Sequence, residues 1–311
     1  MLKKKDILDI ESLDVDEISL ILDTGLSMKE ISERPVKKVP MLRGKTIVLF
    51  FEEPSTRTKL SFDAAAKRLS ADSISISKSS SSIVKGETLI DTAKTLEAMK
   101  PDIIVLRHSS SGAPHLIAKN VKASIINAGD GIHEHPSQAL LDMMSVKEKK
   151  NKIQGLNVSI IGDIAHSRVA RSNIKGFSKM GANVFICGPG TMIPIGVEDL
   201  GCTIKKNVES CVENADVIIM LRVQKERQKN ILFPTEREYA SLFGLNKKRL
   251  SLAKKDVIVM HPGPINRGVE ISSQVADSDC SLILEQVTNG VALRMALFYL
   301  ILGGKKNEDS D

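Results

Sequence analysis

The segment "TIVLFFEEPSTRTKLSF", residues 46–62, joins a short apolar run to a helical pattern and decides the fold class. Its first part, Thr46–Phe51, is rich in β-branched and aromatic residues and is typical of a buried strand. After Pro54, apolar residues follow the i, i+3, i+4, i+7 spacing of one helical face, at Phe62, Ala65, Ala66 and Leu69. A buried strand that leads directly into such a helix predicts a parallel α/β sheet.

Seven further apolar runs, separated by helix-like segments, repeat this pattern along the chain. They are DSISIS, DIIVLR, SIINA, VSIIGD, NVFICG, DVIIML and DVIVMH, at 72–77, 102–107, 124–128, 158–163, 183–188, 216–221 and 256–261. We therefore expect an α/β fold with two domains, each a mostly parallel sheet flanked by helices.

The expected domain boundary lies in the charged stretch "KEKKNKIQGLN", residues 147–157, where a helix gives way to a new strand. The first domain is then 1–150 and the second 151–285. The C-terminal helix is expected in 286–311, and its long apolar surface predicts that it packs back onto the first domain.

Composition excludes several classes of protein. The 311 residues are 42% hydrophobic and 26% charged, and no apolar run reaches the ~18 residues of a membrane span. Asp6 and Asp9 interrupt what would be the apolar part of a signal peptide, so we expect a cytoplasmic protein. The net charge of +6 comes with only 3% aromatic residues, so it is weak evidence for nucleic-acid binding, and small anionic substrates explain it equally well.

Metal and disulfide chemistry are disfavoured. The cysteines contain no C-x-x-C pair, which argues against a disulfide framework or a zinc finger; they are Cys187, Cys202, Cys211 and Cys280. The triplet His133–His135 also makes a poor metal site, because i, i+2 spacing does not gather ligands on one helical face.

The residues Ser55, Thr56, Arg57 and Thr58 stand at the predicted start of a helix, directly after Pro54. Exposed backbone N–H groups, the positive end of the helix dipole and a guanidinium there predict an anion site, with phosphate as the expected ligand. The alternative is an ordinary N-cap by Ser55 or Thr56, with Arg57 in solvent.

Other polar residues come directly after predicted strands or open the next helix. They are Arg107 and His108, Arg168, Arg222 and Gln224, and His261. Because open parallel sheets bind ligands at the carboxyl ends of their strands, these residues predict a site for a substrate with several carboxylate or phosphate groups. His135 and Gln138 lie beside a helix that begins near Pro136, and they suit hydrogen bonding to a polarised carbonyl.

Seven motifs, in order, resemble the catalytic chains of the aspartate carbamoyltransferase family over nearly the whole length. They are PSTRTKLSF, KGETLIDTAKTLEAM, RHS, NAGDGIHEHPSQALLDMMSV, GDIAHSRVARSN, LRVQKER and HPGPINRGVEI. The resemblance implies transfer of the carbamoyl group of carbamoyl phosphate to L-aspartate, in de novo pyrimidine biosynthesis. It implies a carbamoyl phosphate domain, an aspartate domain, no cofactor or metal in this chain, and a homotrimer with shared active sites. A regulatory chain or another pyrimidine-pathway enzyme is a possible further partner.

The resemblance also implies roles for individual residues. Ser55, Thr56, Arg57 and Thr58 would bind the phosphate. Thr58, Arg107 and His135 would polarise the carbamoyl oxygen, while Gln138 and the backbone carbonyl of Pro264, which follows Gly263, would hold the amino group. Ser81 and Lys85 would reach into a neighbouring subunit's site. The aspartate would be bound by Arg168, Arg222 and Gln224, with help from Lys85.

Three rival functions are weighed at this point. One is a non-catalytic anion sensor that kept the fold, which the complete set of candidate catalytic groups disfavours. Ornithine carbamoyltransferases share the phosphate half of the motifs, and Glu53, an extra residue before Pro54, resembles that branch. Against this reading, HPGP stands where an ornithine enzyme has H-C-L-P, and a cationic ornithine should avoid Arg222. A nicotinamide-dependent oxidoreductase is suggested only by Gly162 after a strand, because the G-x-G-x-x-G fingerprint is missing.

Overall fold

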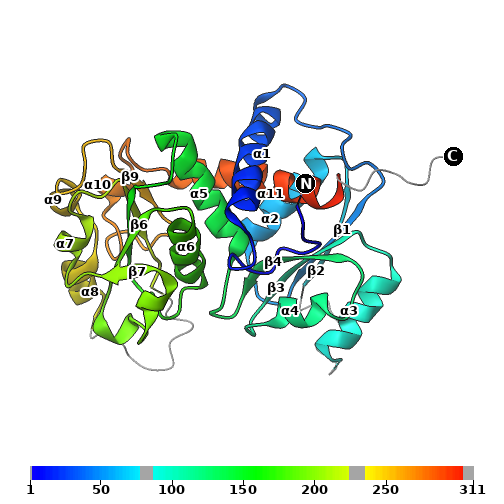
Figure 1. Cartoon of the computed structure of the whole chain (residues 1–311), viewed down its shortest axis with the longest axis horizontal. Helices are drawn as coiled ribbons and strands as arrows, with labels where there is room; N and C mark the ends of the chain where they lie inside the picture. Colours follow the sequence, from blue (N-terminus) through cyan, green and yellow to red (C-terminus); the bar gives the residue numbers. More distant parts are fainter. Residues whose placement is uncertain (1, 78–86, 224–234, 304–311) are drawn as a thin grey trace. The chain divides into compact units, whose positions relative to one another are not determined.

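The structure is a computed structural model that describes residues 2–77, 87–223 and 235–303. The chain divides into two compact units (Figure 1): unit 1 comprises Met1–Met144 and Val287–Asp311, and unit 2 comprises Ser145–Gln286. Each unit contains one parallel sheet with helices on its faces, which confirms the predicted α/β class. The boundaries expected from the sequence, after residues 150 and 285, stay a prediction.

Unit 1 contains a four-stranded sheet in the order β2-β1-β3-β4, with every pair parallel. Its elements are α1 (Val15–Glu33), β1 (Thr46–Phe51), α2 (Thr56–Arg68), β2 (Asp72–Ser77), α3 (Leu89–Ala98), β3 (Ile103–His108), α4 (Ala113–Ala118), β4 (Ser124–Asp130), the first part of α5 (Pro136–Lys150) and most of α11 (Ile283–Leu302).

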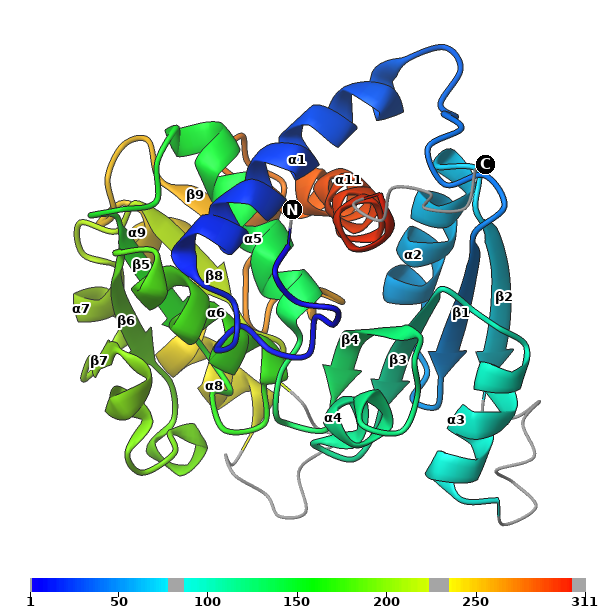
Figure 2. The ribbon, with the colours of Figure 1, turned by 45° about the vertical axis from the view of Figure 1, so that its right-hand side comes forward.

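The two faces of this sheet are buried by different helices. Figure 2 shows α3 and α4 on one side and α2 and α11 on the other. On the first side, alternate residues such as Val48 and Phe50 pack with Leu96 and Ile117 in one apolar cluster. Burial on both faces explains why these strands are continuous apolar runs without a polar alternation.

The C-terminal helix packs within unit 1, as the sequence predicted. Phe298 on α11 lies 5.7 Å from Phe62 on α2, measured between ring centroids. Helix α1 also approaches it closely: a Cβ on Gly25 would lie 3.4 Å from Leu293 Cδ1 and 2.7 Å from Met144 Sδ. Gly25 therefore allows α1 to pack tightly against α5 and α11.

Unit 2 contains a five-stranded sheet in the order β7-β6-β5-β8-β9, again parallel throughout. Its elements are the last part of α5, β5 (Asn157–Ile161), α6 (Arg168–Lys179), β6 (Asn183–Cys187), the short 3-10 turns η3 (Gly190–Met192) and η4 (Val197–Leu200), β7 (Cys202–Ile204), α7 (Val208–Val212), β8 (Val217–Met220), α8 (Glu236–Phe243), α9 (Lys247–Leu250), β9 (Ile258–Met260), α10 (Ser273–Ala276) and the start of α11.

Helices cover both faces of this sheet as well. Figure 1 shows α6 on one side and α7, α9 and α10 on the other. Helix α6 begins where Ser167 Oγ accepts the Ala170 N–H at 3.2 Å, and it buries Ile174 and Phe177. The cysteines Cys187 and Cys211 lie in the apolar cluster on the other side, where burial raises the pKa of the Cys187 thiol to about 11.

Candidate functional site

The carboxyl edge of the unit 1 sheet gathers the predicted phosphate and carbamoyl residues. Strands β1, β3 and β4 are neighbours, with Phe51 paired with Arg107 and His108 paired with Asp130. The chain then enters α2 from β1 and α5 from β4. The predicted residues therefore lie at or just after the ends of these three strands, at one edge of the sheet. They are Ser55, Thr56, Arg57, Thr58, Arg107, His135 and Gln138.

The start of α2 differs from an ordinary capped helix. Ser55 occupies the N-cap position with an extended backbone, but its side chain makes no capping hydrogen bond. The first turn contains no acidic residue, and Thr58 is buried there, 9% exposed. The Ser55 hydroxyl therefore does not satisfy the first N–H groups of α2, which is the condition for an anion to bind them.

Arg107 is held in place by two acceptors at this edge. Its Nη2 forms an ion pair with Glu53 Oε1 at 2.7 Å, and its Nη1 donates to the Ala128 carbonyl at 3.2 Å. Its side chain is only 11% exposed. Glu53, the extra residue before Pro54, thus orients the Arg107 guanidinium from the turn that leads into α2.

His135 and Gln138 are positioned by the first turn of α5, which begins at Pro136. His135 is buried, and its Nδ1 lies 3.4 Å from the Ser137 hydroxyl. When that hydroxyl donates to Nδ1, the neutral ring carries its proton on Nε2, as a donor to a carbonyl oxygen requires. Gln138 Nε2 donates to Asp142 Oδ1 at 3.0 Å, one turn further along α5.

The carboxyl edge of the unit 2 sheet carries the predicted aspartate residues that the structure describes. Strands β5, β8 and β9 are adjacent, with Ile161 paired with Met220. Arg168 is the first residue of α6 and is buried, at 2% exposure. The loop before it is fixed by Asp163, whose Oδ1 lies 2.8 Å from His166 Nδ1.

A buried carboxylate links the segments after β8 and β9. Glu270 Oε1 accepts the Val223 N–H at 3.0 Å and Asn266 Nδ2 at 2.7 Å, while Oε2 accepts the Asn266 N–H at 2.9 Å. Burial raises the pKa of Glu270, against the effect of these hydrogen bonds. Glu270 therefore fixes the backbone next to Arg222 and the loop that contains Pro264.

His261, at the end of β9, shapes the turn before Pro264. Its backbone N–H donates to Gln286 Oε1 at 3.0 Å, and its Nδ1 accepts the Gly263 N–H at 2.8 Å. Sequence reasoning selected His261 from its position after a strand, and its observed contacts are with this loop. It did not select Glu270, although an acidic residue within the motif HPGPINRGVEI could have indicated a structural or functional role.

Some predicted residues lie outside the part of the chain that the structure describes. These are Ser81, Lys85 and Gln224. Within residues 2–77, 87–223 and 235–303, no group of three or more His, Cys, Asp or Glu side chains could hold a metal ion. Over the same residues, no helix is both long and apolar enough to cross a membrane.

Gly162, the glycine after β5, has a packing role. Its φ is +133°, and a Cβ there would lie 3.0 Å from Leu221 Cβ and 3.1 Å from Tyr239 Oη. This close approach of β5 to the segment after β8 explains why a glycine stands at position 162, and no dinucleotide-binding role is needed to explain it.

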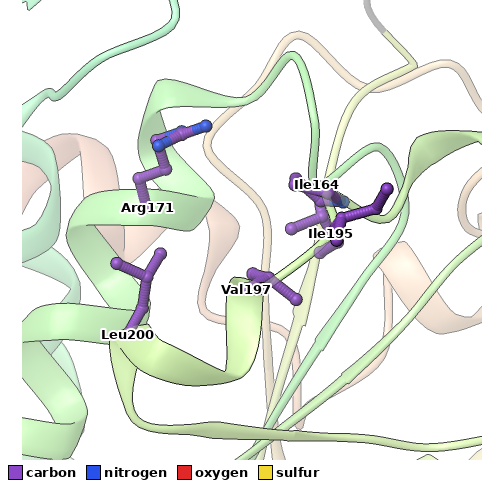
Figure 3. Close-up of a pocket in the computed structure, with 7 residues that line it drawn as sticks. Ile164, Arg171, Ile195, Val197 and Leu200 are labelled. Carbon is purple, nitrogen blue, oxygen red and sulfur yellow. The ribbon is translucent and has the colours of Figure 1, made fainter.

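A small hollow of ≈ 100 Å³ lies elsewhere in unit 2 (Figure 3). Figure 3 shows Arg171 on one side of it and the aliphatic side chains of Ile195 and Val197 opposite. None of the predicted site residues lines this hollow, so it is separate from the candidate site.

Two family models match the chain. The model described as aspartate/ornithine carbamoyltransferase, carbamoyl-P binding domain, matches residues 5–148. The model described as aspartate/ornithine carbamoyltransferase, Asp/Orn binding domain, matches residues 154–301. Together they span both halves of the sequence.

Curated proteins and solved structures agree with these matches. The aspartate carbamoyltransferase catalytic subunit of Desulforapulum autotrophicum is 76% identical, and that of Desulfosudis oleivorans is 64% identical, each over 98% of both chains. Aspartate transcarbamoylase from Trypanosoma cruzi, in complex with carbamoyl phosphate and aspartate, has a TM-score of 0.86 at 28% identity, covering 96% of this chain and 95% of that one. Ornithine carbamoyltransferase from Pyrococcus furiosus has a TM-score of 0.86 at 30% identity, covering 97% and 98%.

Proposed function

Because the chain belongs to the aspartate/ornithine carbamoyltransferase family, we propose that it is an enzyme that transfers the carbamoyl group of carbamoyl phosphate to the amine of L-aspartate. The products are N-carbamoyl-L-aspartate and phosphate, in de novo pyrimidine biosynthesis. The observation that carries the choice of aspartate is the pair Arg168 and Arg222, which follow neighbouring strands of the unit 2 sheet. Two guanidiniums suit a substrate with two carboxylates and disfavour the cationic side chain of ornithine.

In unit 1, we assign phosphate binding to the start of α2. Ser55, Thr56, Arg57 and Thr58 supply hydroxyls, a guanidinium and backbone N–H groups, and the uncapped first turn supports this assignment. Arg107, His135 and Thr58 hydrogen-bond the carbamoyl oxygen, and Gln138 with the Pro264 carbonyl accepts from the carbamoyl amino group.

The proposed reaction needs positioning and charge stabilisation and requires no covalent intermediate with the protein. The aspartate amine attacks the carbamoyl carbon, a C–N bond forms, and negative charge develops on the carbonyl oxygen. The C–O bond to phosphate then breaks, and the departing phosphate takes the proton that the amine loses. Donors aimed at the developing oxyanion are worth about 2.7–4 kcal/mol of barrier each.

We further propose that the enzyme is a cytoplasmic homotrimer in which Ser81 and Lys85 complete the site of a neighbouring subunit. Mixing two inactive variants tests shared sites, because Lys85→Ala and Arg57→Ala remove groups from different chains of one site. Mixed trimers should regain activity that neither variant has alone. No activity in the mixture, with mixed trimers verified by native mass, would contradict shared sites.

Assays of both amino acids test the reaction itself. With carbamoyl phosphate held constant, the enzyme should form N-carbamoyl-L-aspartate, and L-ornithine should give no carbamoylated product above the background without enzyme. The Pyrococcus furiosus likeness makes ornithine the specific alternative. Product from ornithine at a higher kcat/KM than from aspartate would overturn the assignment.

A further inference from the structure

One arginine of the C-terminal helix is buried in the core of unit 1, against helix α2. Arg294 on α11 is 3% exposed, and its guanidinium carbon lies 4.7 Å from the centre of the Phe62 ring. Its Nη1 donates to the Gly290 carbonyl at 2.9 Å. The residues around it on α11, including Leu293 and Met295, are apolar and fully buried. A charge in such surroundings is costly unless a partner compensates it.

Asp142 on α5 supplies the opposing negative charge. Burial lowers the pKa of Arg294 to about 9, and the negative charge of Asp142 opposes this lowering. Asp142 is itself 0% exposed, so both members of the pair lie in the core of unit 1. Replacing such a pair by apolar residues is often neutral or stabilising, so stability alone does not account for it.

Gly290 leaves the room that the guanidinium needs. A Cβ at this position would lie 2.6 Å from Arg294 Nη1 and 3.4 Å from Leu141 Cδ2 on α5. The absence of a side chain at Gly290 therefore lets Arg294 fold back along its own helix toward α5.

Asp142 and Phe62, two residues that face Arg294, each lie one helical turn from a residue of the candidate site. Asp142 lies four residues after Gln138 on α5, and Phe62 lies four residues after Thr58 on α2. Positions i and i+4 lie on the same helical face, so Phe62 and Asp142, which face Arg294 by ring contact and by charge, lie one turn from predicted site residues.

The hydrogen bond from Gln138 to Asp142 fixes which end of the amide faces the site. A carboxylate only accepts hydrogen bonds, so the Gln138 NH2 group turns toward Asp142 and the carbonyl Oε1 points away from it. The amino group of a carbamoyl substrate offers two N–H donors and requires acceptors. An amide turned the other way would present a donor to a donor.

We propose that Asp142, charge-paired with Arg294, is a positioning residue that orients Gln138 Oε1 to accept from the carbamoyl amino group and so selects carbamoyl phosphate over acyl phosphates that lack it. This inference rests on the proposed function, because it takes Gln138 as the residue that holds the amino group.

Acetyl phosphate provides the test, since it replaces the carbamoyl NH2 with a methyl group. The measurement is the Kd of carbamoyl phosphate divided by the Kd of acetyl phosphate, for wild type, Asp142→Asn and Gln138→Ala. In Asp142→Asn the carboxylate becomes an amide whose NH2 group can donate to Gln138 Oε1, so residue 142 no longer fixes the orientation of the Gln138 amide. Affinity for carbamoyl phosphate should fall about 5- to 10-fold, while that for acetyl phosphate changes less than about 2-fold.

Glu17→Gln is the matched control. Glu17 is also a buried carboxylate of unit 1, but its oxygens accept the backbone N–H groups of Lys3 and Asp14. The same carboxylate-to-amide change there should lower Tm without altering the ratio of the two Kd values. A purely structural role for Asp142 would give this result in Asp142→Asn as well, and would overturn the inference.

Two further outcomes keep the inference separate from the proposed function. An unchanged ratio in Gln138→Ala would remove Gln138 from amino-group binding and so contradict the functional assignment. A changed ratio in Gln138→Ala with none in Asp142→Asn would contradict only the positioning role. Should Asp142→Asn fail to fold, the double variant Asp142→Leu/Arg294→Met replaces the pair by apolar residues, and the same loss of discrimination is expected.

Discussion

The two sheets have related topologies, but their carboxyl edges hold functional groups in different ways. In unit 1, the residues lie on regular elements: the start of α2, the end of β3 and the first turn of α5. In unit 2, only Arg168 begins a helix, and the segments with Arg222 and Pro264 are linked through buried Glu270. In unit 1, several helices and strands each position one or more functional side chains. In unit 2, the single carboxylate of Glu270 holds two of the functional segments.

The largest effect is expected from His135→Ala in unit 1. Loss of one donor to the oxyanion should lower kcat about 100- to 1,000-fold. The Kd of phosphate should change much less, because the start of α2 stays intact. Steady-state kinetics and phosphate titration check this, and an unchanged kcat would remove His135 from the reaction.

Glu270→Ala should have the largest effect on stability, in unit 2. The change leaves the N–H groups of Val223 and Asn266 without their carboxylate, so we expect the free energy of unfolding to fall by about 3 kcal/mol in a urea titration. KM for aspartate should rise more than KM for carbamoyl phosphate. Glu209→Ala, at a half-exposed ion pair with Arg249, is the control and should cost about 1 kcal/mol.

Acid titration should separate the units, because two buried carboxylates have opposite shifts. Burial raises the pKa of Asp130 in unit 1. Hydrogen bonds from His133, Asn127 and Gly112 outweigh this effect and hold that pKa below its ordinary value. Its stabilising contribution is present above the unfolded value of 3.8 and is lost as pH falls through the lower folded pKa. The Tm advantage of wild type over Asp130→Asn should therefore shrink on acidification below that value.

Glu270 should show the reverse trend. Burial raises its pKa above the ordinary 4.5, so the part of its stabilising contribution that depends on the bound proton is fully present below 4.5 and is lost as pH rises through the folded pKa, while the hydrogen bonds from Val223 and Asn266 remain. The Tm of wild type relative to Glu270→Gln should thus fall as pH rises above 4.5. Parallel trends in the two variants would contradict the assigned difference between the units.

The smallest effect on stability is expected at one of two glycines that lie at close approaches, one in each unit. In unit 1, a Cβ on Gly25 meets Met144 Sδ, which can move, so Gly25→Ala should change the free energy of unfolding by less than about 1 kcal/mol. In unit 2, a Cβ on Gly244 would lie 2.6 Å from the Ala240 carbonyl oxygen and 2.7 Å from that of Val269. Backbone atoms cannot move aside as easily as the end of a side chain, so Gly244→Ala should lower the free energy of unfolding by about 1–3 kcal/mol. Equal costs in urea titrations would contradict this contrast.

Much of the fold was predictable because buried parallel strands are short apolar runs. The runs at 46–51 and 72–77 coincide with β1 and β2, and the stripe that begins at Phe62 lies on α2. Strand β7 was missed, because it has only three residues, Cys202–Ile204, and two of them are exposed at the sheet edge.

The positions of the candidate residues after strands were also predictable, but what holds them was not. The rule that ligands bind at carboxyl ends of parallel strands selected Arg107 and Arg222 from sequence alone. The partners Glu53, Asp142 and Glu270 are carboxylates that resemble ordinary surface residues in the sequence. Their pairing depends on tertiary contacts, as when Glu270 reaches Val223 across 47 residues.

The division of the chain has a consequence for biosynthesis on the ribosome. Unit 2 is one continuous stretch, Ser145–Gln286, whereas unit 1 needs α11, whose residues Leu293, Leu297 and Phe298 are fully buried. The β-strands of unit 1 thus leave the exit tunnel before unit 2, yet their core is finished only when α11 emerges after it. In the order of synthesis, the half that begins first is completed last.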